Sequence, residues 1–162
     1  MPFHTAYNPN LNYRCAIYAR FSSDMQNRAS AVDQIRNCRD AASSYGWTVL
    51  DEYIRKDEAV SGQSLVGRDG LIELLEIASQ PSCPFDGILI DDTSRFGRNL
   101  SDTLPLTDRF GYRKVFLHFV NRRLDSRDPN FRSLFIRYGE EDENVTRFLN
   151  SFTVGAAKTR SR

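Results

Sequence analysis

Short apolar runs alternate with segments of helical period along this chain, and that alternation constrains the fold more than any other feature. The runs have the length and composition of buried strands. They are CAIYA at 15–19, WTVLDEYI at 47–54, GILI at 87–90 and KVFLHFV at 114–120. Strands that alternate with helices favour a mainly parallel sheet with helices on both faces.

Four other segments predict helices, and they are 29–45, 71–78, 100–110 and 131–152. In the first, apolar residues recur every three or four positions, and Gly46 is suited to end the helix. Pro105 should bend the third helix or shift its start, because proline cannot donate a backbone hydrogen bond. Gly139 interrupts the last segment, which we therefore interpret as one or two helices.

The length of 162 residues suits one domain with a proper core. We predict an α/β fold of three layers, α/β/α, with a central and mainly parallel sheet of four to five strands. The expected parts are a polar N-terminal lead-in over 1–13, the α/β domain over 14–152 and a basic C-terminal stub over 153–162.

The composition excludes several classes of protein. The chain is 40% hydrophobic and 12% aromatic, which is typical of a globular protein and not of a disordered one. No apolar run approaches the roughly 20 residues of a transmembrane helix, and the N-terminus lacks the pattern of a signal peptide. We therefore expect a cytoplasmic protein that makes no contact with a membrane.

The cysteines and histidines give no sign of a metal site. The three cysteines are far apart and form no CxxC pair, which argues against a disulfide framework and against a zinc site. Cys15 and Cys38 fall in apolar patterns and are expected in or near the core. His4 and His118 have no ligand partners nearby in sequence. The net charge of +1 argues against a domain that holds DNA by charge alone.

Polar and charged side chains gather at two predicted strand ends and in one loop. The first strand end carries Arg20 and Ser22, the second is followed by 91–99, and the loop before the second helix holds 61–64 and Arg68. In an alternating α/β fold such loops can converge on one edge of the sheet.

These loops supply serine hydroxyls and arginines but no histidine. A serine without histidine is a poor candidate for a hydrolase triad, and the chain has no GxSxG motif. Guanidinium groups bind a phosphodiester bidentately and stabilise the extra charge of its transition state. A serine among them can attack the phosphorus and form a phosphoserine intermediate. The four arginines are Arg20, Arg68, Arg95 and Arg98.

Each of these features also has an ordinary structural interpretation. A serine after a strand is more often a turn residue or a helix cap than a nucleophile. Arg95 and Arg98 could form a solvated helix face or pair with Asp91, Asp92 or Asp102. The convergence of three loops is what favours a phosphate site.

Four motifs occur in the order and at about the spacing of the catalytic domain of serine recombinases. They are YARFSSDMQ, VDQI, DEAVSGQS with GRDGL, and IDDTSRFGRN. The chain therefore resembles the resolvase–invertase family over about residues 14–120. The likeness is closest to the large-recombinase branch of that family.

The resemblance implies a site-specific DNA recombinase that works without metal or nucleotide cofactor. In such a reaction Ser22 attacks a DNA phosphodiester and forms a 5′-phosphoserine intermediate, after which strands are exchanged and rejoined. The phosphate would be bound by Arg20, Arg68 and Arg95, with Asp91 positioning the arginines. The supporting residues that the resemblance implies are Gln26 and Gln34, which would order the loop, and Arg98.

The resemblance also implies DNA as a partner and a homodimer that assembles into a tetramer on DNA. The charged and aromatic segment 131–152 is then a candidate interface, although it could equally be a helix that packs only on its own sheet. Members of the family continue into a separate DNA-binding region. This chain ends at Arg162, so we expect that domain to be absent.

One position departs from the family pattern. Where the motif commonly reads Asp-Arg, this chain reads Asp91-Asp92. An acid near a phosphate is unfavourable unless it is paired. Arg98 is a candidate replacement for the missing arginine.

Two alternatives from other classes stay open at this point. The first is a weakened or inactive fragment that dimerises without cutting DNA, which Asp92 and the short C-terminus favour. The second is a phosphoacceptor signalling domain with Mg²⁺ at Asp91 or Asp92. The arginine and serines at the neighbouring strand end, in place of acids, argue against the second alternative.

Overall fold

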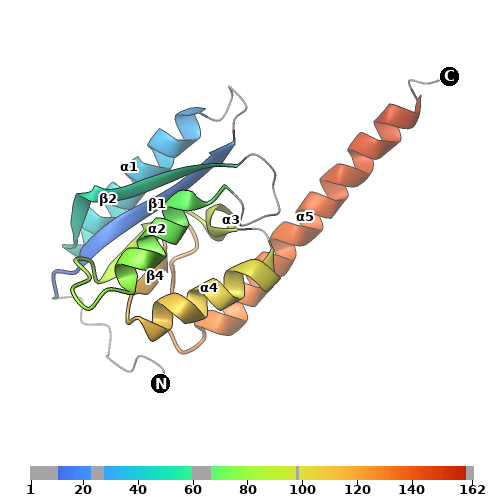
Figure 1. The fold of residues 1–162 in the computed structure, drawn as a ribbon. Helices are drawn as coiled ribbons and strands as arrows, with labels where there is room; N and C mark the ends of the chain where they lie inside the picture. Colours follow the sequence, from blue (N-terminus) through green and yellow to red (C-terminus); the bar gives the residue numbers. More distant parts are fainter. Residues whose placement is uncertain (1–10, 23–27, 60–66, 98, 160–162) are drawn as a thin grey trace.

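The computed structural model describes residues 11–22, 28–59, 67–97 and 99–159, although some side chains in these ranges, that of Ser22 among them, lie outside the described part. Figure 1 shows an α/β body from which one long helix projects. The elements in chain order are β1 (Arg14–Ser22), α1 (Arg28–Tyr45), β2 (Thr48–Ala59), α2 (Asp69–Ala78), β3 (Gly87–Ile90), α3 (Thr93–Phe96), α4 (Leu100–Tyr112), β4 (Phe116–Phe119), β5 (Leu124–Asp125) and α5 (Phe131–Thr159).

The five strands form one sheet in the order β2-β1-β3-β4-β5. Strand β1 is central and pairs in parallel with β2 and β3, β3 pairs in parallel with β4, and only the short β5 runs antiparallel to its neighbour. The prediction of a mainly parallel sheet of four to five strands is therefore confirmed.

Helix α1 covers one face of the sheet. Its Cys38 and Ala42 pack with Cys15 and Ile17 of β1 and with Trp47 in a buried cluster. Cys15 and Cys38 are both fully buried, which confirms that they are core residues. Burial raises the pKa of both thiols above the usual range, so neither is suited to act as a nucleophile.

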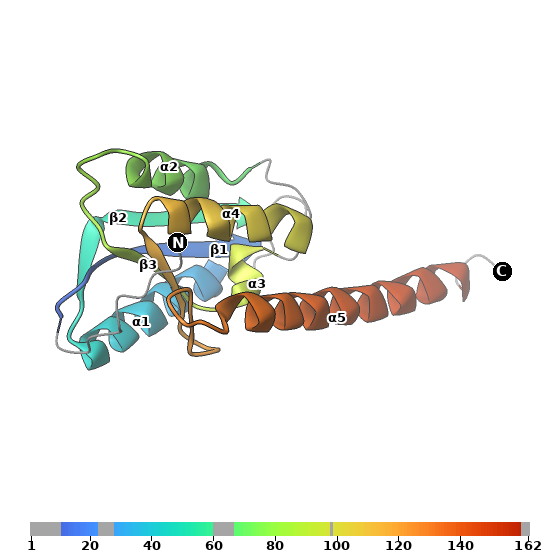
Figure 2. The ribbon, with the colours of Figure 1, turned by 90° about the horizontal axis from the view of Figure 1, so that it is seen from below.

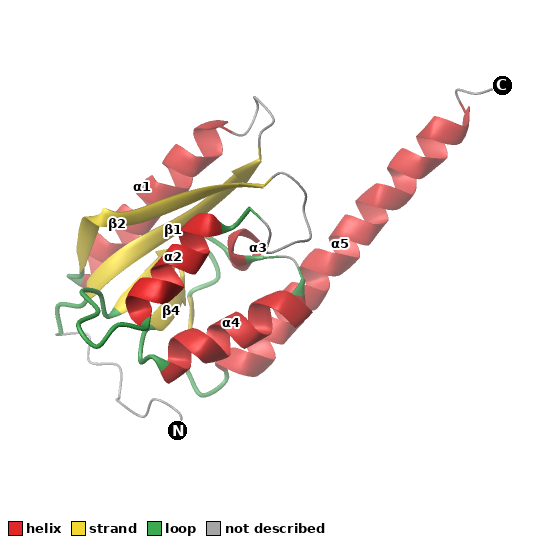
Figure 3. Cartoon of the chain, in the orientation of Figure 1, coloured by secondary structure: helices red, strands yellow, loops and turns green. Residues whose placement is uncertain are grey.

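Helices α2 and α4 and the first turns of α5 pack in the cluster on the opposite face, and Figure 2 shows α2 and α4 across the sheet from α1. The three layers predicted from the alternation of strands and helices are thus present, and Figure 3 shows the strands between α1 and α2. The aromatic side chains of this second buried cluster are Tyr18, Phe85, Phe96, Phe110, Phe119, Phe131 and Phe135.

Strands β2 and β5 differ most from the sequence prediction, while β1 ends three residues beyond its predicted end at Ala19. Strand β2 continues five residues beyond the predicted end at Ile54, to Ala59, and includes the charged run 55–58. It is an edge strand, where charged side chains can reach solvent, so the apolar pattern alone does not show its length. Strand β5 has only two residues and gives no periodic signal.

Helices α1, α2 and α4 begin and end within two residues of their predicted bounds. Helix α1 ends before Gly46, whose positive φ of 73° is a conformation that glycine adopts without strain. Pro105 lies inside α4, which begins at Leu100, so the proline does not shift the start of that helix. Gly139 does not divide the last segment, because α5 is a single helix there. A Cβ atom on Gly139 would lie 2.5 Å from the Leu100 side chain, so glycine permits α4 and α5 to approach closely.

The two ends of α5 have different surroundings. Its first turns bury Phe131 and Phe135, whereas Phe148 and Phe152 are 62% and 63% exposed. The two exposed rings contact each other edge to face with centroids 4.8 Å apart. The helix also continues past the domain boundary that we predicted at residue 152. Among the described residues, no helix is long and apolar enough to cross a membrane.

Candidate active site

The carboxyl ends of β1 and β3 lie at the same edge of the sheet. Tyr18 of β1 is in register with Ile90, the last residue of β3, and β1 then continues beside β2 for four more residues. Ser22 is the last residue of β1, where its backbone pairs with Ala59 of β2. The Ser22 side chain lies outside the described residues, as do Gln26, Arg98 and the loop 61–64.

Gln34 of α1 holds the backbone of Arg20 in place. The Gln34 Nε2 group donates to the Arg20 carbonyl at 2.9 Å, and the Arg20 amide donates to Gln34 Oε1 at 3.2 Å. Gln34 is 2% exposed and Arg20 is 8% exposed, so both hydrogen bonds are shielded from water. This amide clamp fixes the end of β1 two residues before Ser22.

Arg68 reaches the same edge from the residue that precedes α2. Its Nη2 group donates to the Arg95 carbonyl at 3.2 Å, and its guanidinium lies 5.8 Å from the centre of the Tyr18 ring. The residue is 4% exposed. Among the residues that the structure describes, the buried Nε group of Arg68 has no hydrogen-bond acceptor. A buried guanidinium with a spare donor is suited to bind an anion.

Asp57 fixes the start of α2, and we did not predict a role for it from the sequence. Its carboxylate accepts hydrogen bonds from the Gly70 amide at 2.8 Å, the Leu71 amide at 3.1 Å and the Tyr18 hydroxyl at 3.0 Å. A carboxylate at a helix N-terminus satisfies free amides and offsets the helix dipole. Arg68 occupies the N-cap position of this helix, so Asp57 and Tyr18 together set its place.

The ionisation of Tyr18 reflects these neighbours. Burial raises the pKa of its hydroxyl above the usual range, Arg68 and Arg20 lower it, and Asp57 raises it further. The hydroxyl therefore stays protonated and donates to Asp57. Arg68 lies beside the Tyr18 ring, and Arg20 follows two residues later on the same face of β1.

Gly97 closes the corner between α3 and α4 over Arg68. A Cβ atom at this position would lie 2.3 Å from Thr103 Cγ2 and 3.1 Å from Arg68 Nη1. No side chain fits there without moving one of these groups. Glycine at position 97 therefore leaves the space that the Arg68 guanidinium occupies.

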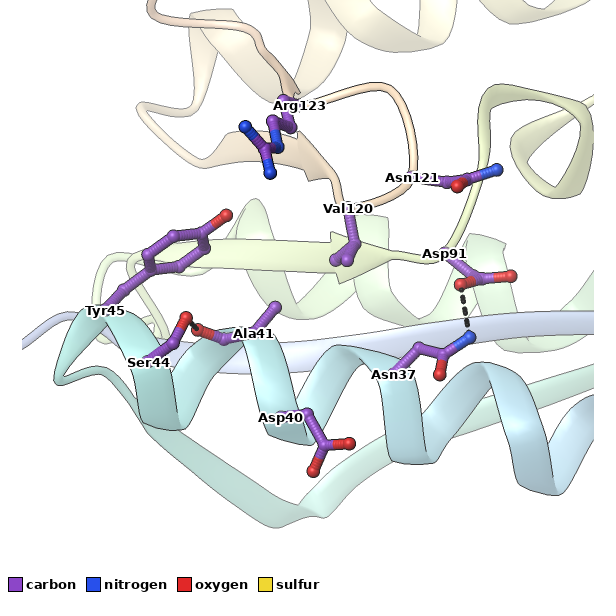
Figure 4. Close-up of a pocket in the computed structure, with 9 residues that line it drawn as sticks. All are labelled: Asn37, Asp40, Ala41, Ser44, Tyr45, Asp91, Val120, Asn121 and Arg123. Atoms are coloured by element: carbon purple, nitrogen blue, oxygen red, sulfur yellow. Dashed lines mark hydrogen bonds between the residues drawn. The ribbon is translucent and has the colours of Figure 1, made fainter.

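Asp91 lies on the α1 side of the strand end. Its Oδ1 atom accepts a hydrogen bond from Asn37 Nδ2 at 3.1 Å, as Figure 4 shows. The two residues line an open polar hollow together with Asn121 and Arg123, among others. The role of positioning arginines that we expected for Asp91 stays a prediction.

Asp92, the residue that departs from the family pattern, is paired. Its Oδ1 atom accepts from Arg122 Nε at 3.1 Å, and its Oδ2 atom accepts from the Ser94 hydroxyl at 3.1 Å. Arg122 follows β4 and is far from Asp92 in sequence, so nothing in the local motif indicates this partner. The charge of Asp92 is therefore not left free beside the site.

Comparison with known proteins identifies the family. The family model described as "Resolvase, N terminal domain" matches residues 15–147. The chain belongs to the resolvase family. The resemblance drawn from the four sequence motifs is thereby confirmed. No curated protein sequence matches the chain.

Solved structures of serine recombinases share this fold. The N-terminal catalytic domain of TP901-1 integrase is 26% identical with a TM-score of 0.61, over 84% of this chain and 98% of that one. The C-terminal catalytic domain of ISC1926 TnpA, an IS607-like serine recombinase, is 27% identical with a TM-score of 0.56, over 66% of this chain and 70% of that one. A resolvase family site-specific recombinase from Streptococcus pneumoniae is 21% identical with a TM-score of 0.65, over 93% and 100%, and supports the fold alone.

These findings leave the phosphoacceptor interpretation without support. Asp91 and Asp92 hydrogen-bond to Asn37 and to Arg122 and Ser94, respectively. Within the described ranges, no group of three or more His, Cys, Asp or Glu side chains could hold a metal ion.

Proposed function

We propose that this chain is the catalytic domain of a site-specific DNA recombinase and that Ser22 is its nucleophile. The observation that carries the proposal is the buried Arg68 guanidinium, whose Nε donor meets no acceptor among the described residues, at the edge of the sheet where β1 ends in Ser22. Membership of the resolvase family supplies the reaction class. Arg20, held by Gln34, and Arg95, whose carbonyl holds Arg68, complete the phosphate site.

The proposed chemistry is a reversible transfer of one phosphodiester bond. The Ser22 hydroxyl gives up its proton as its Oγ atom attacks the phosphorus, an O–P bond forms, and the bond between the phosphorus and the 3′ oxygen breaks. The 3′ oxygen takes up a proton and leaves as a hydroxyl, so the 5′ phosphate stays on the serine. Attack by the 3′ hydroxyl of another strand reverses these steps and releases Ser22. The arginines offset the negative charge that grows on the phosphate oxygens in the transition state.

The ion pair of Asp92 with Arg122 argues against the alternative of an inactive fragment that dimerises without cutting DNA. An unpaired acid would repel the phosphate, and this was the main reason to expect a weakened enzyme. Because Arg122 already binds that carboxylate, the repulsion is reduced. We therefore favour an active domain over a fragment that only dimerises.

We further propose that the chain forms a homodimer through α5 and a tetramer on DNA. The exposed Phe148 and Phe152 support this assembly, because a contact between two copies would remove both rings from water. Sedimentation of the chain and of a Phe148→Ser/Phe152→Ser variant, with and without DNA, tests the assembly. An unchanged mass for the variant would argue against it.

The cytoplasmic location expected from the sequence stays a prediction.

The nucleophile is tested by trapping the covalent intermediate. The full chain is incubated with a pool of DNA duplexes whose central base pairs are randomised and which carry a nick. Because the cleaved fragment beside the nick can dissociate, the strand cannot be rejoined. Denaturing gels then detect a protein–DNA adduct. We expect an adduct from the wild type and from Ser23→Ala, and none from Ser22→Ala. An adduct that persists in Ser22→Ala would refute the assignment.

A further inference from the structure

A mixed-charge cluster links the candidate site to the long helix. It consists of Asp92, which precedes α3, of Arg122 in the turn after β4, and of Tyr138, Glu141 and Asp142 on α5. Arg122 lies 3.1 Å from the Asp92 carboxylate, 3.5 Å from that of Asp142 and 3.7 Å from that of Glu141. Its guanidinium also lies 4.4 Å from the centre of the Tyr138 ring. We call these five residues the Arg122 cluster.

The centre of the Arg122 cluster is partly removed from water. The side chains of Asp92 and Asp142 are each 19% exposed and that of Arg122 is 27% exposed. Salt screens such partly buried charges much less than surface charges. Within these five residues, Arg122 carries the positive charge and the three acids carry negative charges. Removal of Arg122 would take away the ion pair that its Nε group forms with Asp92.

A continuous set of contacts connects Arg122 to the phosphate site. Asp92 is the N-cap residue of α3, and Arg95 lies within that short helix. The Arg95 carbonyl in turn accepts the hydrogen bond from Arg68. On the other side, the Thr93 hydroxyl lies 3.5 Å from the Asp142 carboxylate, so α3 is bound to α5 as well. A shift of Arg122 would therefore move the element that carries Arg95 and holds Arg68.

Burial would by itself lower the pKa of Arg122, but the hydrogen bond and charge of Asp92, with Asp142 and Glu141, raise it. The guanidinium is thus bound more strongly in its charged form than a solvated arginine. The stacking on Tyr138 adds a preferred plane for the group.

We propose that Arg122 is a positioning residue of the recombinase site. It neutralises Asp92, which stands where the family motif commonly has an arginine, and fixes the α3 corner that carries Arg95 and holds Arg68. Arg122 and Asp92 form one unit, and their charges can be exchanged as long as the two side chains stay opposite in charge. This inference rests on the proposed function of Ser22, because it concerns the same phosphate site.

Charge exchange tests the unit in the full chain. Arg122→Glu places a fourth acid in the cluster, and we expect the rate of Ser22–DNA adduct formation on the randomised nicked duplexes to fall at least tenfold. Adding Asp92→Arg restores an opposite pair, and we expect the double variant to recover to within about threefold of the wild type. Rescue of this kind requires the two side chains to act together.

The matched control is Arg132→Glu. Arg132 pairs with Asp108 at 2.8 Å, but both side chains are 59% exposed, so the same change of charge should leave the adduct rate within about twofold of the wild type. Urea midpoints of all variants are measured in parallel, and rates are compared where every variant is folded. Should Arg122→Glu not fold, Arg122→Gln replaces it and Asp92→Asn replaces the partner change.

The outcomes separate the two proposals. A slow Arg122→Glu variant that Asp92→Arg rescues supports the positioning role. A folded Arg122→Glu variant with a normal adduct rate, or a double variant no faster than the single one, overturns it while Ser22 stands. If the wild type forms no adduct, the proposed function of Ser22 fails and the positioning role falls with it, and the urea midpoints then report only whether the pair stabilises the fold.

Discussion

Removal of the Asp57 carboxylate should destabilise the domain far more than removal of an ordinary acid on the same strand. Asp57→Ala leaves three buried donors without their acceptor, namely the amides of Gly70 and Leu71 and the hydroxyl of Tyr18. A buried donor left unsatisfied costs about 1–3 kcal/mol, and water that enters the space can recover part of this. We therefore expect a loss of about 4 kcal/mol in the free energy of unfolding.

Two further variants divide this loss among its causes. Asp57→Asn keeps one oxygen acceptor, and we expect about half the effect. Tyr18→Phe removes a single hydrogen bond and should cost about 1 kcal/mol in the wild type. In the Asp57→Ala background the same change should cost almost nothing, because the hydroxyl that it removes has already lost its acceptor. The coupling energy between the two sites is then about 1 kcal/mol.

Urea unfolding followed by circular dichroism measures the free energy of unfolding of the wild type, the three single variants and the double variant. The control is Asp51→Ala, which removes an acid of the same strand whose side chain is 75% exposed and pairs with Arg39. Its cost should stay below about 1 kcal/mol, as for other surface ion pairs. If Asp57→Ala unfolds within about 1 kcal/mol of the wild type, or if Tyr18→Phe costs the same in both backgrounds, then Asp57 does not hold α2 as argued above.

Two shorter predictions concern packing and acid stability. Gly97→Ala should cost about 1–3 kcal/mol in urea unfolding, because its Cβ atom would lie 2.3 Å from Thr103 Cγ2, and Thr103→Ser, which removes that methyl group, should recover part of the loss. Burial alone would raise the pKa of Asp125, but hydrogen bonds from Arg127 and His118 lower it to about 2. Because this pKa lies below that of the unfolded chain, the stabilisation of about 2 kcal/mol is complete above pH ~4 and is lost as the pH falls to ~2. Asp125→Asn should remove this dependence in acid titrations of stability, and an unchanged slope would contradict the assignment.

Much of the fold follows from local patterns because the buried strands carry strong signals. The run GILI is bounded as predicted, since β3 is buried on both sides and its residues are uniformly apolar. The end of β2 could not be placed in this way. Its residues 55–58 are charged and lie in the sheet because of their pairing with β1, which is a contact between distant parts of the chain.

The candidate site likewise contains residues that local motifs predict and residues whose roles depend on contacts between distant parts of the chain. The motifs identify Arg20, Gln34 and Arg68, and the structure brings each to the edge where β1 ends. Asp57 stands at the head of the DEAVSGQS motif, but it lies twelve residues before the start of α2, so no local capping pattern indicates its contact with that helix. Arg122 could not have been found, because its function depends on a partner thirty residues away in sequence and on a helix still further along the chain.

The long α5 helix acts as a lever arm on the domain. From Asp142 to Thr159 it extends by about 26 Å, at a rise of 1.5 Å per residue. A tilt of about 10° at Asp142 therefore moves the far end by roughly 4–5 Å, a displacement close to the rise of one helical turn. Figure 1 shows that this far end stands clear of the sheet. A molecule bound at the far end of α5 would thus be displaced by nearly one helical turn when the base of the helix tilts by this angle.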